Sequence, residues 1–346
     1  MAQHEVTKPV ELLDDKGHII EEGWARRLYW KYDHAKIKAP WFRKKEWDYY
    51  YVLSQERGYG ITFTMSDLGY AGLFALAWLD FRDGSYTQVD TMSMLPRGKT
   101  GFSPTSETGD VGFSDKKLSL SYRVRGNERI ITVECPGLVN GRGERGLSGE
   151  ITLTRDPGMD TMCIATSWKE NRRAFYFNQK INCMPAKGAI TIGKTKYIFD
   201  PKDSFGGLDW GRGNWTYKNR WYWGSASGLL DGRPFGWNIG YGFSDRTPAS
   251  ENMVFYNNRA HKLDEVTFHI DTSNYMVPWR FTSNDGRFEM DFEPVVDRAS
   301  AANFGIIKTD QHQVFGYSTG HVVLDDGKKL KVNRLLGFAE DVLNWY

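Results

Sequence analysis

Apolar and polar residues alternate strictly along several segments of the chain. Over residues 118–125 the sequence LSLSYRVR places every apolar side chain at an even position and every polar one at an odd position. The same period of two recurs over residues 265–270 and 288–292. Alternate side chains point to opposite faces of a β-strand, whereas a helix repeats every 3.6 residues. These segments therefore predict half-buried strands in both halves of the chain.

Turn residues separate the strand-like segments. Four Asp-Gly pairs lie between them, at residues 83–84, 231–232, 285–286 and 326–327. Asp and Gly tolerate the positive φ angles that tight hairpin turns require. Helical signals are few: a turn after Asp200-Pro201 and a short helix at residues 337–345. Parallel sheets need long crossover helices, so we expect an all-β fold of antiparallel strands in an up-and-down order.

A weak internal repeat indicates two halves. Residues 47–84 and 221–258 each open with an aromatic strand and continue into a glycine-rich one. Closing each half into a barrel would remove exposed sheet edges. Pro185 interrupts strand character. The expected domains are therefore an N-terminal extension at residues 1–46, a first barrel at 47–185 and a second barrel at 186–346.

Composition excludes several classes of function. The 346 residues contain 45 Lys plus Arg and 43 Asp plus Glu, so no net field favours nucleic acid. The three cysteines are widely spaced and predict buried thiols rather than a disulfide framework or zinc site. Residues 1–22 lack the apolar run of a signal peptide, and no stretch approaches a transmembrane span. A cytoplasmic location is expected, and the sequence leaves the oligomeric state open.

The segment Asp209 to Asn252 is the strongest candidate for a binding site. It holds five of the 13 tryptophans and eight glycines, and glycine beside a large ring lets a ligand or backbone approach closely. A hydrophobic small molecule is the expected partner in this setting of rings. The expected ligand-binding residues in this segment are Trp210, Arg212, Trp215, Trp221, Trp223, Asn238 and Asn252.

Two carboxylates in this segment are candidate proton donors. Asp209 lies beside Trp210 and three residues before Arg212, so it is either a salt-bridge partner or an acid with a shifted pKa. Glu251 enters an apolar run and is either a hydrogen-bonded carboxylate at the barrel mouth or a general acid. The pair of Trp210 and Arg212 also has two interpretations: a plug that closes one end of the barrel, or a ligand contact.

Other chemistries lack a motif. The histidines are scattered and include no HExxH pair, so no metal is expected. The glycine-rich pieces at residues 141–143 and 211–213 lack the strand-to-helix context of a phosphate cradle. Neither a nucleophile elbow nor an evident nucleophilic cysteine is present.

The residues Asp209-Trp210-Gly211-Arg212-Gly213, Trp221-Tyr222-Trp223 and Glu251-Asn252, with Gly69-Tyr70 and Asp80 earlier, resemble the domain of unknown function 2804 family. That family is distantly similar to the carotenoid 1,2-hydratase, kievitone hydratase and tocopherol cyclase group. The resemblance implies two lipocalin-like (calycin-like) barrels side by side and a pocket near their shared face. It also implies acid-base chemistry on isoprenoid-like substrates without a cofactor. Tyr70 joins the expected ligand-binding residues.

Three hypotheses follow for the function. The first is a cofactor-independent hydratase, isomerase or cyclase acting on a lipophilic molecule, with Asp209 or Glu251 as the acid. The second is a carrier protein that binds a hydrophobic ligand without changing it. The third is a carbohydrate-binding or carbohydrate-processing protein in which tryptophan faces stack on sugar rings.

Overall fold

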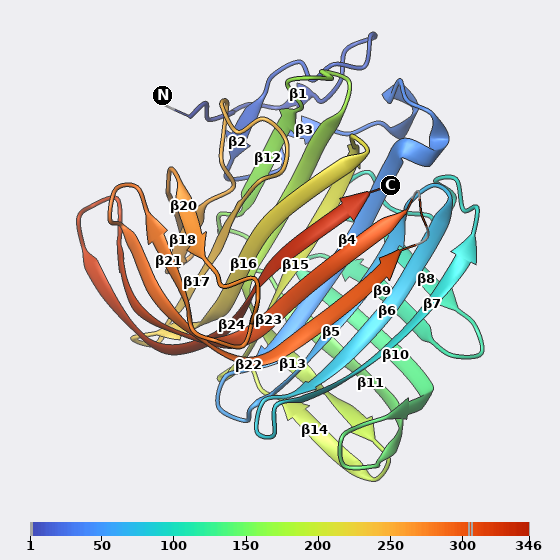
Figure 1. Ribbon diagram of the computed structural model, residues 1–346, viewed down its shortest axis with the longest axis vertical. Helices are drawn as coiled ribbons and strands as arrows, with labels where there is room; N and C mark the ends of the chain where they lie inside the picture. Colours follow the sequence, from blue (N-terminus) through green and yellow to red (C-terminus); the bar gives the residue numbers. More distant parts are fainter. Residues whose placement is uncertain (1–2, 304, 306, 346) are drawn as a thin grey trace.

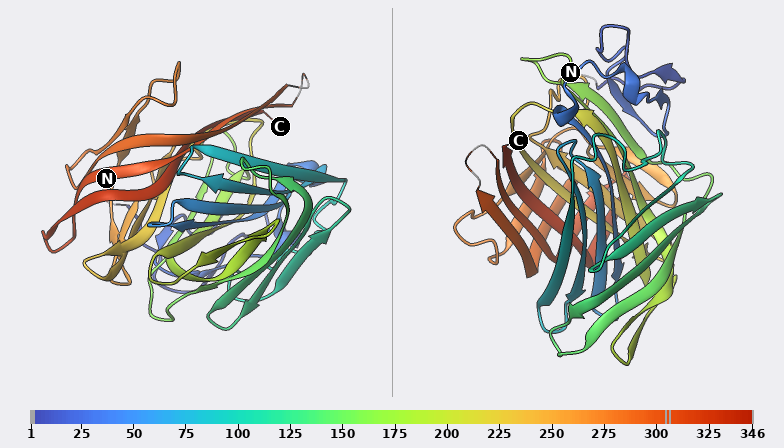
Figure 2. Two further views of the ribbon diagram at one scale, coloured as in Figure 1. Left: turned by 90° about the horizontal axis from the view of Figure 1, so that it is seen from below. Right: turned by 90° about the vertical axis from the view of Figure 1, so that its right-hand side faces the viewer.

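Two curled antiparallel sheets lie side by side in the computed structural model, which describes residues 3–303, 305 and 307–345 (Figure 1). Each sheet curves around its own core as a half-barrel (Figure 2). The expected all-β architecture of two barrels side by side is confirmed, and the described helices are two short 3₁₀ turns, η1 (His34–Lys36) and η2 (Trp41–Arg43).

The first sheet contains most strands of the N-terminal half. Its main path runs in the order β7 (Ser85–Met94), β6 (Ala71–Asp80), β5 (Tyr59–Asp67), β4 (Lys44–Ser54), β15 (Ser204–Asn214), β13 (Phe175–Ile192), β11 (Arg145–Thr154), β10 (Glu128–Val139), β9 (Ser119–Arg125) and β8 (Asp110–Ser114). Beside this path lie β12 (Met162–Ser167), β14 (Thr195–Phe199) and β2 (Gly23–Ala25), and a separate pair is formed by β1 (Val10–Glu11) and β3 (Trp30–Lys31).

The second sheet contains the C-terminal strands. They are ordered β19 (Arg259–Lys262), β18 (Met253–Tyr256), β17 (Arg233–Tyr241), β16 (Lys218–Leu230), β24 (Lys329–Trp345), β23 (Lys308–Val323), β22 (Phe288–Asn303), β21 (Trp279–Ser283) and β20 (Val266–His269). All of these neighbours are antiparallel, and every Asp-Gly pair lies in a hairpin turn, between β6 and β7, β16 and β17, β21 and β22, and β23 and β24. The predicted hairpins are therefore confirmed.

The C-terminal segment differs from the sequence-based expectation. Residues 337–345, expected to be a short helix, form the end of strand β24. This segment pairs with β16 on one side and β23 on the other. The backbone hydrogen bonds of two neighbours outweigh the weak local preference for a helix.

The chain passes from one sheet to the other later than the expected boundary at residues 185 and 186. β13 runs through this point, and the crossing comes between Asn214 and Lys218. Pro185 lies on β13 opposite Phe205, next to a register shift in the pairing with β15. Proline is tolerated at such bulges because one backbone donor is already unpaired there, so Pro185 marks an irregularity within a strand.

The two halves meet along a shared face. β4, β15 and β13 supply it from the first sheet, and β16, β24 and β23 from the second. Tyr49, Tyr51, Trp223, Phe315 and Phe338 belong to one buried cluster at this face. The Tyr51 hydroxyl also lies 2.8 Å from Ser225 Oγ and 2.8 Å from Ser227 Oγ. Aromatic packing and hydrogen bonds thus join the two halves.

Candidate functional site

A buried ion pair lies on the first sheet's side of the shared face. Lys180 on β13 is directly opposite Asp209 on β15, and Lys180 Nζ is 2.8 Å from Asp209 Oδ2. The side chains are only 5% and 11% exposed. Asn178 Nδ2 donates to Asp209 Oδ1 at 2.6 Å, whereas Asn178 Oδ1 has no hydrogen-bond partner among the described residues. A buried acceptor without a partner suits a position next to a bound molecule.

The ion pair contacts a polar chain that crosses into the second half. Lys180 Nζ lies 3.7 Å from the centroid of the Trp223 ring, in cation–π geometry. Trp223 Nε1 donates to Asn238 Oδ1 at 2.6 Å. Asn238 Nδ2 in turn donates to Glu251 Oε2 at 3.1 Å. The site therefore combines Asp209, Trp223, Asn238 and Glu251 from the tryptophan-rich segment with Lys180 from β13.

Glu340 is a third carboxyl group in the same region. It lies on β24 opposite Trp223 of β16 and is 5% exposed. Trp221 Nε1 donates to Glu340 Oε1 at 2.9 Å, and Gln313 Nε2 donates to Glu340 Oε2 at 3.0 Å. Tyr49 from the first half reaches Gln313 through its hydroxyl, so Glu340 is held by groups from both halves.

Burial raises the pKa of two of these carboxyl groups. It raises the pKa of Glu340 to about 7, because the nearby Lys180 and the Trp221 hydrogen bond offset only part of the cost of removing charge from water. Burial also raises the pKa of Glu251, against the charge of Lys180 and the Asn238 hydrogen bond. Asp209 adds like charge that raises the pKa of both. The pKa of Glu340 suits proton transfer near neutral pH.

Aromatic rings surround one end of this charged cluster. The Trp215 ring lies edge-to-face with Trp47, Trp221 and Phe243, at centroid separations of 5.1, 6.1 and 4.9 Å. The Trp47 ring lies over β15 at Gly211, where any Cβ atom would overlap it. Glycine at this position is therefore needed for the ring to cover the strand. The Tyr176 ring is stacked parallel to the Trp47 ring, with the centroids 6.3 Å apart.

Two of the expected ligand-binding residues lie on the other face of β15. Trp210 and Arg212 alternate with Asp209 and point into the first half-barrel. Arg212 Nη1 donates to Asp48 Oδ1 at 2.9 Å, and its guanidinium carbon lies 4.1 Å from the centroid of Trp210. Glu46 is also near the guanidinium. Arg212 is therefore held inside the first half-barrel by carboxylates and by the Trp210 ring, and Asp209 pairs with Lys180 instead.

Asn252 and Tyr70 also lie outside the charged cluster. Asn252 Oδ1 accepts from the backbone of Gly240, and its Nδ2 donates to the carbonyl of Asp264. These bonds give Asn252 a role in holding the loop that carries Glu251. Tyr70 follows β5, with the Lys45 ammonium 4.5 Å from its ring centroid.

Lys180 and Glu340 are absent from the sequence-based set of site residues. Both are charged residues inside long strands that are mostly buried, and that is the signal that could have revealed them. Within the part of the chain that the structure describes, no three His, Cys, Asp or Glu side chains are arranged so that they could hold a metal ion. Among the same residues, no helix has the length and apolar character needed to cross a membrane.

The fold and the shared face define an all-β protein of two side-by-side half-barrels. The chain belongs to the family described as domain of unknown function (DUF2804), whose model matches residues 3–346. A search of curated proteins found no match.

Solved structures with this architecture cover most of the chain. CghA, crystallised with Sch210972, has 12% identity and a TM-score of 0.52, with 88% of each chain covered. A protein named as a putative AttH from Nitrosomonas europaea has 13% identity and a TM-score of 0.52, with 87% of this chain and 92% of that one covered. Kievitone hydratase from Nectria haematococca has 13% identity and a TM-score of 0.45, with coverage of 87% and 88%. The first two likenesses concern the fold.

Proposed function

We propose that this protein is a cofactor-independent acid-base enzyme that acts on a lipophilic small molecule at the face shared by its two half-barrels. The observation that carries the proposal is the buried group of three carboxyls and one ammonium, formed by Asp209, Glu251, Glu340 and Lys180. Buried charge is costly, so four charged groups buried close together at one face suit a functional role.

Proton transfer to carbon is the reaction that the cluster suits best. A protonated Glu340 or Glu251 can donate to one carbon of a double bond, which leaves a cation on the other carbon. Water can then add to that carbon and lose its proton to a carboxylate, which gives hydration. Loss of a neighbouring proton gives isomerisation, and attack by a second double bond gives cyclisation. Asp209 beside Lys180 supplies a carboxylate for the proton-accepting step.

The surroundings favour an apolar substrate. Trp215, Trp221 and Phe243 place ring edges and faces beside the cluster, and rings of this kind bind apolar groups and stabilise nearby positive charge. The Trp223 face is already occupied by Lys180, so Trp221, which also binds Glu340, is the ring better placed to act on a developing cation. The tryptophans Trp210, Trp215, Trp223 and Trp237 are buried, which disfavours an exposed platform for sugar rings.

The test begins with the molecule that the protein retains. Native mass spectrometry of the purified protein, followed by extraction, identifies a bound compound. This compound and panels of isoprenoids and unsaturated fatty acids are then assayed as substrates. Glu340→Gln, Glu251→Gln and Asp209→Asn each remove an acid or base without changing side-chain size. We expect turnover to fall by about 10²- to 10⁴-fold in at least one variant, the usual contribution of a general acid or base.

Glu46→Gln is the matched control. Glu46 is as buried as Glu340, with 6% exposure, but it bonds to Tyr32 inside the first half-barrel. It should retain turnover wherever it folds. If all three site variants convert the compound at the wild-type rate, the acid-base assignment is wrong. A compound that is retained but never converted would identify the protein as a carrier.

A further inference from the structure

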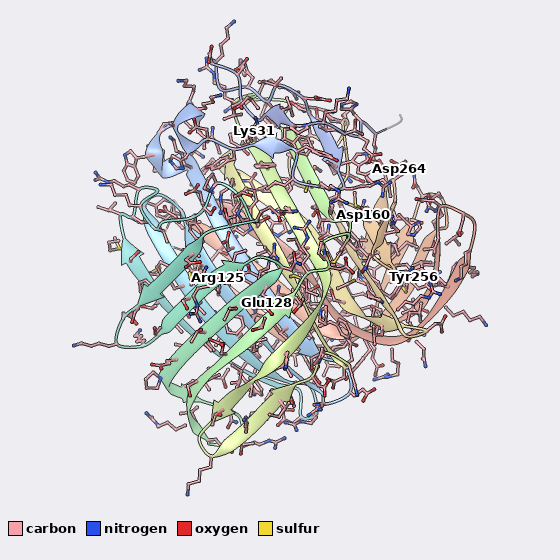
Figure 3. All side chains as sticks on the ribbon, turned by 180° about the vertical axis from the view of Figure 1, so that it is seen from behind. Lys31, Arg125, Glu128, Asp160, Tyr256 and Asp264 are labelled. Carbon is pink, nitrogen blue, oxygen red and sulfur yellow. The ribbon has the colours of Figure 1, made fainter. Side chains whose placement is uncertain are left out.

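A cavity open to solvent lies on the first half-barrel, beside the N-terminal segment and away from the shared face. Its volume is about 440 Å³, within the range of small-molecule sites. In Figure 3, Arg125 and Glu128 bracket the β9–β10 turn that forms one wall, below the N-terminal segment that carries Lys31. None of the residues lining this cavity belongs to the cluster of Asp209, Glu251 and Glu340.

The lining carries more positive than negative charge. Arg27, Arg129 and Arg155 contribute three guanidinium groups, and Glu107 is the one carboxylate of the lining. Glu107 is held by Arg155, whose Nη1 lies 2.5 Å and 2.7 Å from its two oxygens. Arg129 also feels the charges of Glu107 and, from outside the lining, of Asp48.

Arg129 is the key residue because its strand directs it inward. It shares a face of β10 with the core residues Ile131 and Val133, and it is 2% exposed. Nη2 donates to the carbonyl of Ser106 at 3.2 Å, while Nε and Nη1 have no hydrogen-bond partner among the described residues. Burial lowers the pKa of Arg129 and Arg155 lowers it further, against the opposing effect of Tyr50, Glu107 and Asp48. These groups compensate only part of the cost of burying the guanidinium, so an anion bound in the cavity would stabilise it.

We infer that this cavity binds a small organic anion, with its carboxylate or phosphate group at Arg129 and Arg27. Guanidinium groups match the planar, multi-oxygen geometry of such groups better than ammonium groups do. The apolar remainder of the ligand fits against Leu28, Tyr29 and Pro157, which share the lining. Short-chain carboxylic acids and phosphate monoesters have this combination of an anionic head and an apolar body.

Isothermal titration of the full chain tests this site with defined probes. Octanoate and octyl phosphate should each bind saturably at one site, and octanol, which has the same chain without charge, should bind at least about tenfold more weakly. Titration with inorganic phosphate distinguishes a site for the free phosphate ion from a site for an organic phosphate. Binding as tight as that of octyl phosphate would assign the site to the free ion, and much weaker binding would assign it to a ligand with an apolar body.

Variants connect the binding to the cavity. Arg129→Met keeps the side-chain volume and removes the charge, and Arg27→Ala removes the half-buried arginine with little risk to folding. Each should weaken octanoate binding at least about tenfold. Arg298→Met is the matched control, since Arg298 is also buried with an unpartnered Nε but lies elsewhere. Glu340→Gln should leave octanoate binding unchanged, which separates this site from the shared face.

Three results would overturn the inference: no saturable binding of either anion at millimolar concentration, octanol binding as tight as octanoate, or wild-type affinity in Arg27→Ala. Should Arg129→Met fail to fold, Arg27→Ala alone decides the outcome.

Discussion

Glu340→Gln should change how the stability of the protein depends on pH. A carboxyl pKa raised from 4.5 to about 7 makes the ionised folded state less favourable by about 3 kcal/mol, because a tenfold change in acidity is worth about 1.4 kcal/mol. The folded state holds this proton more tightly than the unfolded state. The stability that Glu340 contributes is therefore complete below pH 4.5 and is lost as the pH rises through 7.

Glutamine at this position has no proton to lose. The free energy of unfolding of Glu340→Gln, minus that of the wild type, should therefore rise by about 3 kcal/mol between pH 4.5 and pH 8. A constant offset of about 1–3 kcal/mol is also expected, because the amide presents an N–H group to either Trp221 or Gln313, both of which donate to Glu340.

Urea unfolding followed by tryptophan fluorescence at several pH values measures both quantities. The constant offset shifts the stability difference equally at every pH. The change of that difference with pH therefore reports the pKa of Glu340. A difference that stays constant from pH 4.5 to pH 8 would refute the raised pKa of Glu340.

Further predictions concern the ion pair, the glycine beneath the tryptophan and the thiols. Lys180→Met should lower the free energy of unfolding in urea by about 3–5 kcal/mol, because it leaves Asp209 buried without its partner. The double variant Lys180→Met/Asp209→Asn should lose less stability than the sum of the two single variants. Full additivity of the two losses would argue against the ion pair. Gly211→Ala should cost about 1–3 kcal/mol by crowding the Trp47 ring, while Gly137→Ala, with open space at its Cβ position, should lower the melting temperature little or not at all. All three cysteines are buried, so a thiol reagent should label them only after unfolding, and rapid labelling of the native protein would contradict their placement.

Local sequence patterns predicted several of the strands and the turns between them. The alternation at residues 118–125 became β9, and the Asp-Gly pairs became hairpin turns, because both signals act over neighbouring residues. The end of β24 and the crossing after Asn214 depend on which distant strands pair. Local sequence patterns carry no information on which distant strands pair. A proline at a bulge, such as Pro185, looks like a domain boundary as long as the partner strand is unknown.

The site was predictable only in part, for two different reasons. Asp209 and Trp210 are adjacent on one strand and therefore point to opposite faces, so the period of two could have separated them before the structure was known. Lys180 and Glu340 lie on β13 and β24, far from the tryptophan-rich segment in sequence. The pairing of β24 with β16 brings Glu340 to Trp223, and the packing of the two sheets brings Lys180 there. Both depend on the whole fold.

The most direct test of the proposed chemistry is incubation of the retained compound with the protein in D₂O, followed by mass spectrometry of the product. Proton transfer to carbon, whether it leads to hydration, isomerisation or cyclisation, should place solvent deuterium on a carbon atom in the wild type and much less in Glu340→Gln or Glu251→Gln. Recovery of the compound unchanged and free of deuterium would contradict the acid-base function and favour a carrier.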